Sequence, residues 1–436
     1  MTTRTTAPAL PRPAAPQDAW LSQLAVALDL RRVSPLLPLP ESAVEPPRWE
    51  IRSIRYKPRT NCIVLYESLQ GGRPTWAYAK LYSEERRPRT ASRHRLSVYY
   101  PELRMFVSAF PADLHMPALR VATRPGDSYK ILRRLVPREE RHRFLPYWEE
   151  WQPVRYKPEQ SCVMRGRHGS DSDPAVRVHY AEFYAGADGA KTAEFHRHFD
   201  GRGDCGFLTP RLLGFSEKFR VMLLAGLVGQ PLRLYLQRAE GDVASAVERS
   251  AKALAAWRRM PIPATAAPAP SAEEELLGAA STLKALLPDH ASECAELART
   301  LIATEPKPPA DSVLLHGDFH HDQVLLDEDH IGLHNLNSLA AGDPAVDVGS
   351  FCAHAWYLAV REEIGVERAR WLCKLFVSTY EEAAGQTIEP HRLKWHLSAA
   401  LARLAPAPFR RFDVEWPQRM RTLIGLAELA ASGGLS

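Results

Sequence analysis

An internal repeat constrains the first half of this 436-residue chain more than any other sequence feature. The sequence Arg-Tyr-Lys-Pro occupies residues 55–58 and recurs at residues 155–158, and in both copies a cysteine stands four residues after the proline. A second match, Tyr-Ala-x-x-Tyr, occupies residues 78–82 and recurs at residues 180–184. The two motifs therefore keep nearly the same spacing in both copies, which indicates a duplicated structural unit.

Each copy has the pattern of a strand, a polar turn and a second strand, with the turns at residues 70–72 and 168–170. We therefore expect a β-hairpin unit that occurs twice. The copies differ in chemistry, because the first carries Lys80 where the second carries Glu182.

Composition excludes several classes of protein. The formal net charge is +5, and no block of five or six basic residues occurs, so we expect no nucleic-acid partner. The longest strongly apolar run, Val221 to Val228, is far shorter than the roughly 20 residues of a membrane span, so we expect no membrane association. The first residues lack an apolar leader, and the six cysteines are widely spaced without a metal-ligand pattern. These features predict a cytoplasmic protein with reduced thiols.

Residues 313–351 contain the most informative polar pattern. An apolar run leads into His316-Gly317-Asp318, and two short strands are predicted at residues 324–326 and 331–333. Gly342-Asp343-Pro344 then begins a helix. A carboxylate on a tight loop, followed by a hairpin that brings polar ligands beside it, can orient a hydroxyl group next to a metal–nucleotide complex.

This segment resembles the aminoglycoside phosphotransferase and choline-kinase superfamily, whose members are relatives of the protein kinases. The family has a catalytic loop H-G-D-x-x-x-x-N, a metal loop I-D-x-D/E, and a later motif G-D-P-x-x-D. The residues that match these patterns are His316, Gly317, Asp318, Gly342, Asp343, Pro344 and Asp347, together with His320, which the family often has two positions after the aspartate.

The resemblance implies an α+β fold with the two lobes of a protein kinase. Residues 151–236 correspond to the β-rich N-lobe, with the second Arg-Tyr-Lys-Pro repeat and a hinge near Leu223–Gly229. Residues 237–436 correspond to the helical C-lobe with the His-Gly-Asp loop. Residues 17–150 remain as an additional N-terminal module with the first repeat, and residues 1–16, rich in Thr, Pro and Ala, are expected to be a disordered tail.

The resemblance also implies roles for single residues. Asp318 is the candidate catalytic base, which would orient or deprotonate an acceptor hydroxyl group. The other matching residues are expected to be structural, with the later aspartates anchoring the loop or capping a helix: His316, Gly317, His320, Asp343 and Asp347.

Three positions that handle ATP and its metal depart from the family pattern. The asparagine that binds the metal is Gln323 here, whose extra methylene displaces the amide oxygen by about 1 Å. The metal-binding aspartate is Asn335, which removes a full negative charge from a site for a hard cation. The lysine that contacts the phosphates is Glu182, which replaces an attraction with a repulsion. These changes argue against efficient phosphoryl transfer.

Two functions follow as alternatives. The favoured one is a degenerate kinase, or pseudokinase, whose cleft binds a small-molecule ligand or a protein partner and needs no cofactor. The alternative is an active kinase that uses ATP and Mg²⁺ to phosphorylate a hydroxyl group, with Asp318 as the base and Lys80 of the first repeat as a substitute for the missing lysine. A metal held by the histidines around the loop is less favoured, because His316 and His320 belong to the family pattern.

Overall fold

The structure is a computed structural model that describes residues 15–38, 47–70, 73–84, 95–124, 126–141, 151–168, 177–200, 205–238 and 241–435. The chain divides into two compact units: Met1–Ala109, Leu277–Glu296 and Ala405–Ile424 form the first, and Phe110–Leu276, Leu297–Leu404 and Gly425–Ser436 form the second. Most of the predicted N-terminal tail and the central residues of both predicted hairpin turns lie outside the described residues.

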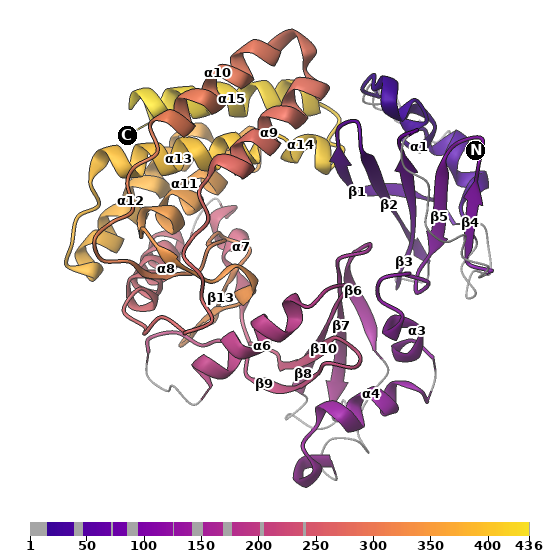
Figure 1. Cartoon of the computed structure of the whole chain (residues 1–436). Helices are drawn as coiled ribbons and strands as arrows, with labels where there is room; N and C mark the ends of the chain where they lie inside the picture. Colours follow the sequence, from indigo (N-terminus) through magenta and orange to yellow (C-terminus); the bar gives the residue numbers. More distant parts are fainter. Residues whose placement is uncertain are drawn as a thin grey trace, which may run out of the picture. The chain divides into compact units, whose positions relative to one another are not determined.

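The first unit contains a five-stranded antiparallel sheet in the order β1-β2-β3-β5-β4 (Figure 1). Side chains alternate along β1, so that Ile54 and Tyr56 are buried whereas Lys57 is exposed, as expected for a sheet with one covered face. Tyr56 meets Phe409 of helix α14 edge to face, with 5.8 Å between the ring centroids. The elements are η1 (Ala19–Leu21), α1 (Leu24–Ala27), α2 (Leu30–Val33), η2 (Ser34–Leu36), β1 (Glu50–Lys57), β2 (Asn61–Gln70), β3 (Arg73–Tyr82), β4 (Ser97–Tyr100), β5 (Met105–Ala109), η5 (Pro288–His290) and α14 (Ala407–Arg410).

The second unit contains another five-stranded antiparallel sheet with the same topology, in the order β6-β7-β8-β10-β9 (Figure 1). Helix α6 lies between β8 and β9 in the chain. The elements are α3 (Ala118–Ala122), α4 (Ser128–Leu135), η3 (Arg138–Glu140), β6 (Gln152–Lys157), β7 (Ser161–His168), β8 (Arg177–Tyr184), α6 (Asp188–Phe199), β9 (Leu212–Ser216) and β10 (Val221–Ala225).

The predicted repeat of strand, turn and strand is confirmed, and the similarity extends over the whole of both sheets. Tyr56 is paired with Cys62 in the first sheet, and Tyr156 is paired with Cys162 in the second. The residue in the turn after the proline has a positive φ in both copies, 59° for Arg59 and 58° for Glu159. The two sheets therefore share their register as well as their strand order.

The two copies also share an aspartate that precedes each sheet. The alignment of the two repeat motifs did not reveal this aspartate. The hydroxyl group of Tyr56 donates to Oδ2 of Asp18 at 2.6 Å, and that of Tyr156 donates to Oδ2 of Asp113 at 2.8 Å. In both cases Oδ1 of the aspartate accepts the backbone N–H two residues later, from Trp20 in the first copy and from His115 in the second. The motif tyrosine thus ties each sheet to the segment before it.

The rest of the second unit is largely helical, so the chain is α+β, with β-rich regions followed by helices. Short strands form two small sheets, β11-β13-β14 and β12-β15. Helices α9 (Glu273–Leu286), α10 (Ala291–Ala303) and α15 (Trp416–Ser432) contribute residues to both units. The other elements are β11 (Gln230–Pro231), α7 (Leu232–Leu236), α8 (Val243–Trp257), β12 (Val313–Leu315), β13 (Val324–Leu326), β14 (Ile331–Leu333), η6 (Leu336–Ser338), β15 (Ala340–Gly342), α11 (Ala345–Val360), α12 (Val366–Ala384) and α13 (Pro390–Leu404).

An aromatic cluster fixes the position of the His-Gly-Asp loop in the second unit. Phe319, the residue after Asp318, is fully buried, with ring centroids 6.4 Å from Phe351 of α11 and 5.9 Å from Phe376 of α12. Phe351 and Phe376 stack on each other at 3.7 Å. Because the residue after Asp318 is packed among these rings, the closely packed core holds the backbone of Asp318 in place. Among the helices of the described ranges, none combines the length and the apolar character that crossing a membrane requires.

Candidate active site

The loop that carries Asp318 has a backbone conformation that requires glycine. Gly317 has a φ of 76°, and a Cβ atom at this position would lie 2.1 Å from the backbone oxygen of Ser338. Asp347 of α11 holds the same loop: its Oδ2 accepts the N–H of His316 at 2.7 Å, and its Oδ1 accepts the N–H of Gly317 at 2.9 Å. The loop is therefore fixed by both steric and hydrogen-bonding constraints.

The two aspartates of the later motif lie in different electrostatic surroundings. Burial raises the pKa of Asp347 to about 7, against the opposing effect of its backbone hydrogen bonds. For Asp343, burial also acts to raise the pKa, but His396, the N–H of Ala345 and Arg392 outweigh it and lower the pKa to about 2. Asp343 Oδ2 lies 2.7 Å from Nη1 of Arg392, and its Oδ1 accepts the N–H of Ala345, the first residue of α11, at 2.9 Å. Asp343 therefore ties α11 to α13.

Asp318 is surrounded by amide groups. Nε2 of Gln323 and Nδ2 of Asn335 both donate to Oδ2 of Asp318 at 3.3 Å. Oδ1 lies 3.7 Å from Nε2 of His320, and 40% of the Asp318 side chain is exposed. Burial acts to raise the pKa of Asp318, but the hydrogen bond and positive charge of His320 and the charge of His354 bring it below its usual value. Asp318 is consequently an ionised, accessible carboxylate.

The donor groups around Asp318 do not fit a tightly bound Mg²⁺ ion. This cation prefers carboxylate oxygens, whereas both predicted metal ligands, Gln323 and Asn335, carry amide groups. Gln323 and Asn335 direct their amide N–H groups toward Asp318, and Oδ1 of Asn335 accepts a hydrogen bond from Nδ2 of Asn337 at 2.7 Å. The side chains at the two predicted metal positions therefore serve as hydrogen-bond donors to Asp318.

Glu182 lies on β8 and is connected to the loop that contains Asn335. Its Oε2 lies 2.7 Å from the hydroxyl group of Tyr184, which in turn lies 3.1 Å from Oδ1 of Asn337. Thr192 of α6 donates to the same Oδ1 at 2.9 Å. Burial raises the pKa of Glu182, so its protonated form is favoured more than in water. A chain of polar contacts thus links the sheet and α6 to the neighbourhood of Asp318.

Lys80 lies on β3 of the first unit, whereas Asp318, Glu182, Gln323 and Asn335 lie in the second. Its Nζ is 5.3 Å from the centre of the Tyr82 ring. The structure brings the other four predicted residues together and leaves Lys80 in a separate compact unit.

Sequence reasoning missed Asn337, Tyr184 and Thr192, which complete this network. Asn337 could have been found, because it stands at the second acidic position of the family's metal loop. Tyr184 was noted as part of the repeat but not as a site residue. Thr192 had no sequence signal, because its contact with Asn337 joins residues 145 positions apart.

The histidines around the loop make packing and backbone contacts. His316 is fully buried, and its Nε2 donates to the backbone oxygen of His334 at 3.0 Å. The rings of His320 and His354 stack, with 4.2 Å between their centroids. Within the described residues, one group has metal-ligating atoms within 4.8 Å of one another: His320, His321 and Asp322.

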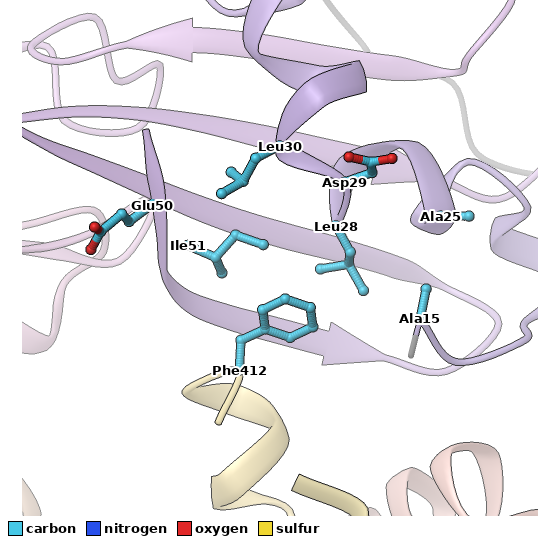
Figure 2. A pocket seen from close by; sticks show the side chains of 8 residues that line it. All are labelled: Ala15, Ala25, Leu28, Asp29, Leu30, Glu50, Ile51 and Phe412. Atoms are coloured by element: carbon cyan, nitrogen blue, oxygen red, sulfur yellow. The ribbon is translucent and has the colours of Figure 1, made fainter. Parts of the chain in front are cut away.

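The first unit contains a pocket of about 400 Å³ (Figure 2). Leu28, Ile51 and Phe412 point toward one another across it, and the carboxylates of Asp29 and Glu50 lie at its edges. The remaining lining residues are Ala15, Ala25 and Leu30. None of the predicted site residues lines this pocket.

Comparisons with known proteins agree with the geometry of the second unit. Residues 170–385 match the model of a family described as the phosphotransferase enzyme family. The solved structure of choline kinase from Cryptosporidium parvum Iowa II is similar with a TM-score of 0.51 and 12% identity, over 71% of this chain and 96% of that one. This likeness shows that the chain shares the fold of that choline kinase.

Two further structures have lower TM-scores. A thermostable mutant of aminoglycoside phosphotransferase APH(4)-Ia, in complex with ADP and hygromycin B, has a TM-score of 0.45 and 14% identity over 66% of this chain and 95% of that one. Spectinomycin phosphotransferase APH(9)-Ia, in complex with ADP and spectinomycin, has a TM-score of 0.46 and 10% identity over 66% of this chain and 94% of that one. A comparison with curated proteins gives no match.

Proposed function

We propose that the chain, whose residues 170–385 match the model of the phosphotransferase enzyme family, is a degenerate kinase that binds a ligand in a kinase-like cleft without efficient phosphoryl transfer. The observation that carries this proposal is the arrangement around Asp318. Two amide groups donate to its Oδ2 at the positions where the family binds a metal, so the negative charge of Asp318 is satisfied without a cation.

The position of Glu182 supports the same proposal. A lysine at this position would attract the phosphates of ATP, whereas a glutamate repels them when it is ionised. Glu182 is hydrogen-bonded to Tyr184, which in turn contacts Asn337 beside the predicted metal position. The second unit therefore has polar contacts of its own where a kinase has a cation.

A titration of the full-length protein with nucleotides tests this proposal. We expect ATP or ADP to raise the melting temperature without Mg²⁺, and we expect no transfer or hydrolysis of the γ-phosphate above that of an Asp318→Ala variant. A Mg²⁺-dependent release of ADP that disappears in Asp318→Ala would contradict the proposal. Since Asp318 is partly exposed, this variant is expected to fold.

The alternative is an active small-molecule kinase that uses ATP and Mg²⁺, and the lowered pKa and accessibility of Asp318 favour it, because an ionised carboxylate can accept a proton from a hydroxyl group. In this alternative, Lys80 takes the role of the phosphate-contacting lysine, because the family's position for that lysine is occupied by Glu182. A Lys80→Ala variant distinguishes the two: loss of nucleotide binding would support the active kinase, and unchanged binding would support the degenerate one.

We also propose a cytoplasmic location and a small-molecule ligand. All six cysteines are free thiols and five of them are buried, which suits a reducing compartment. The solved structure that shares this fold is a choline kinase, an enzyme named for a small-molecule substrate, which supports a ligand of this size.

A further inference from the structure

The Arg-Tyr-Lys-Pro motif of the second sheet contains one residue without a structural role. Tyr156 donates its hydroxyl proton to Asp113, and the backbone oxygen of Lys157 accepts the N–H of Gln160 to close the turn that Pro158 begins. The side chain of Arg155, by contrast, is exposed and makes no hydrogen bond and no ion pair with any residue in the described part of the chain. The structure of the sheet therefore does not explain why arginine stands here.

The register of the sheet shows which way Arg155 faces. Arg155 is opposite Val163, Val163 is opposite Glu182, and Glu182 is opposite Met222, so these four residues form one row across β6, β7, β8 and β10. Side chains in such a row lie on the same face of the sheet. This is the face whose Glu182 connects through Tyr184 to the loop beside Asp318. The strands lie about 5 Å apart, so the backbones of Arg155 and Glu182 are about 10 Å apart.

The charge of Arg155 acts on Glu182 across this face of the sheet. Burial raises the pKa of Glu182, and the guanidinium group of Arg155 opposes this effect. Glu182 stands where the family has the lysine that contacts the phosphates. Arg155 therefore shares a face of the sheet with the position from which a kinase contacts the phosphates.

We propose that Arg155 binds a phosphate group of the ligand in this cleft and that it does so without a metal ion. This inference rests on the proposed function, and it names the ligand class as a phosphorylated small molecule. The planar guanidinium group can donate two parallel hydrogen bonds to phosphate oxygens, which a lysine cannot do. Burial raises the pKa of Glu182, which favours its uncharged form and so reduces its repulsion of an anion.

Binding of ATP to the full-length protein in excess EDTA, measured by isothermal titration calorimetry, tests this inference. Arg155→Ala should weaken binding by about 10-fold to 100-fold, the usual effect of losing a hydrogen bond to a charged group. Arg155→Lys should bind with intermediate affinity. The matched control is Arg55→Ala, which removes the same residue from the same motif in the first sheet and should leave the affinity unchanged.

Two further probes separate the phosphate group from the rest of the nucleotide. Inorganic tripolyphosphate should compete with ATP for the wild-type protein but not for Arg155→Ala, whereas any binding of adenosine should be equal in both proteins. Circular dichroism checks that the exposed substitution leaves the fold intact.

Several results would overturn the inference. It fails if Arg155→Ala binds metal-free ATP as tightly as the wild type does, if Arg55→Ala is the variant that loses affinity, or if neither ATP nor tripolyphosphate binds the wild type. The first two results leave the degenerate-kinase proposal standing, whereas absence of ATP binding also contradicts the expected rise in melting temperature. The degenerate-kinase proposal fails by itself if Asp318-dependent phosphoryl transfer is found.

Discussion

Restoring one carboxylate to the site should create a response to Mg²⁺ that the natural protein lacks. In Asn335→Asp, the amide nitrogen that donates to Oδ2 of Asp318 at 3.3 Å is replaced by a carboxylate oxygen. Two unit charges at this distance repel by about 1 kcal/mol in water and about 5 kcal/mol at an effective dielectric constant of 20. Because 40% of the Asp318 side chain is exposed, we expect the lower part of this range.

The assay is the melting temperature of the variant with EDTA and with millimolar Mg²⁺. Without metal, a repulsion of about 1–2 kcal/mol should lower the melting temperature by about 2–5 °C relative to the wild type. Mg²⁺ should reverse this loss, because a divalent cation between two carboxylates removes their repulsion and supplies the ligand charge that the wild type lacks.

The control is Asn335→Ala, which removes the same hydrogen bond without adding charge and should show no response to Mg²⁺. The reasoning is refuted if the wild type and Asn335→Asp respond equally to Mg²⁺, or if Asn335→Asp is as stable as the wild type in EDTA. In the first case the amide site already binds the metal, and in the second case the two carboxylates do not face each other.

Three further predictions concern the framework of the site and can be measured by urea denaturation. The pKa of Asp343 is lowered from 3.8 to about 2. The stabilisation from its ion pair with Arg392 is therefore present above about pH 4 and is lost as the pH falls toward 2. Asp343→Asn should lower the free energy of unfolding by about 2 kcal/mol at pH 7 and should flatten this part of its pH profile. Gly317→Ala should destabilise by about 3 kcal/mol, since it combines a positive φ with a backbone clash, and an unchanged midpoint would contradict this conformation. Tyr184→Phe leaves the half-buried Glu182 without this hydrogen bond and should destabilise by about 1–3 kcal/mol, whereas equal stability would show that the contact contributes nothing.

Much of the candidate site could be predicted from the sequence because its residues lie close together along the chain. Asp318 and Gln323 are five residues apart on one loop, and Asn335 follows on the hairpin that the apolar pattern predicts. The register of this hairpin, in which Val324 is paired with Leu333, brings these residues together without any distant contact. The altered metal ligands were therefore visible before the structure was known.

The sequence did not predict what the altered residues bind. Gln323 and Asn335 direct their amide N–H groups toward Asp318. This arrangement depends on side-chain orientation, which the spacing of residues in the sequence does not specify. That Tyr184 would meet Asn337 depends on a contact between residues 153 positions apart. Such a contact forms only when the sheet and the hairpin of the second unit pack together.

For the repeat, too, some features were determined by the sequence and others only by the tertiary structure. The sequence by itself determined that residues 55–58 and 155–158 begin equivalent strands, and that the second copy has Glu182 where the first has Lys80. Only the tertiary structure showed that the equivalence extends over five strands, because the outer strands of the two sheets have diverged in sequence while keeping their hydrogen-bonded register. It also decided that Arg155 shares a face with Glu182, since antiparallel pairing, and not position along the chain, determines which side chains lie in one row.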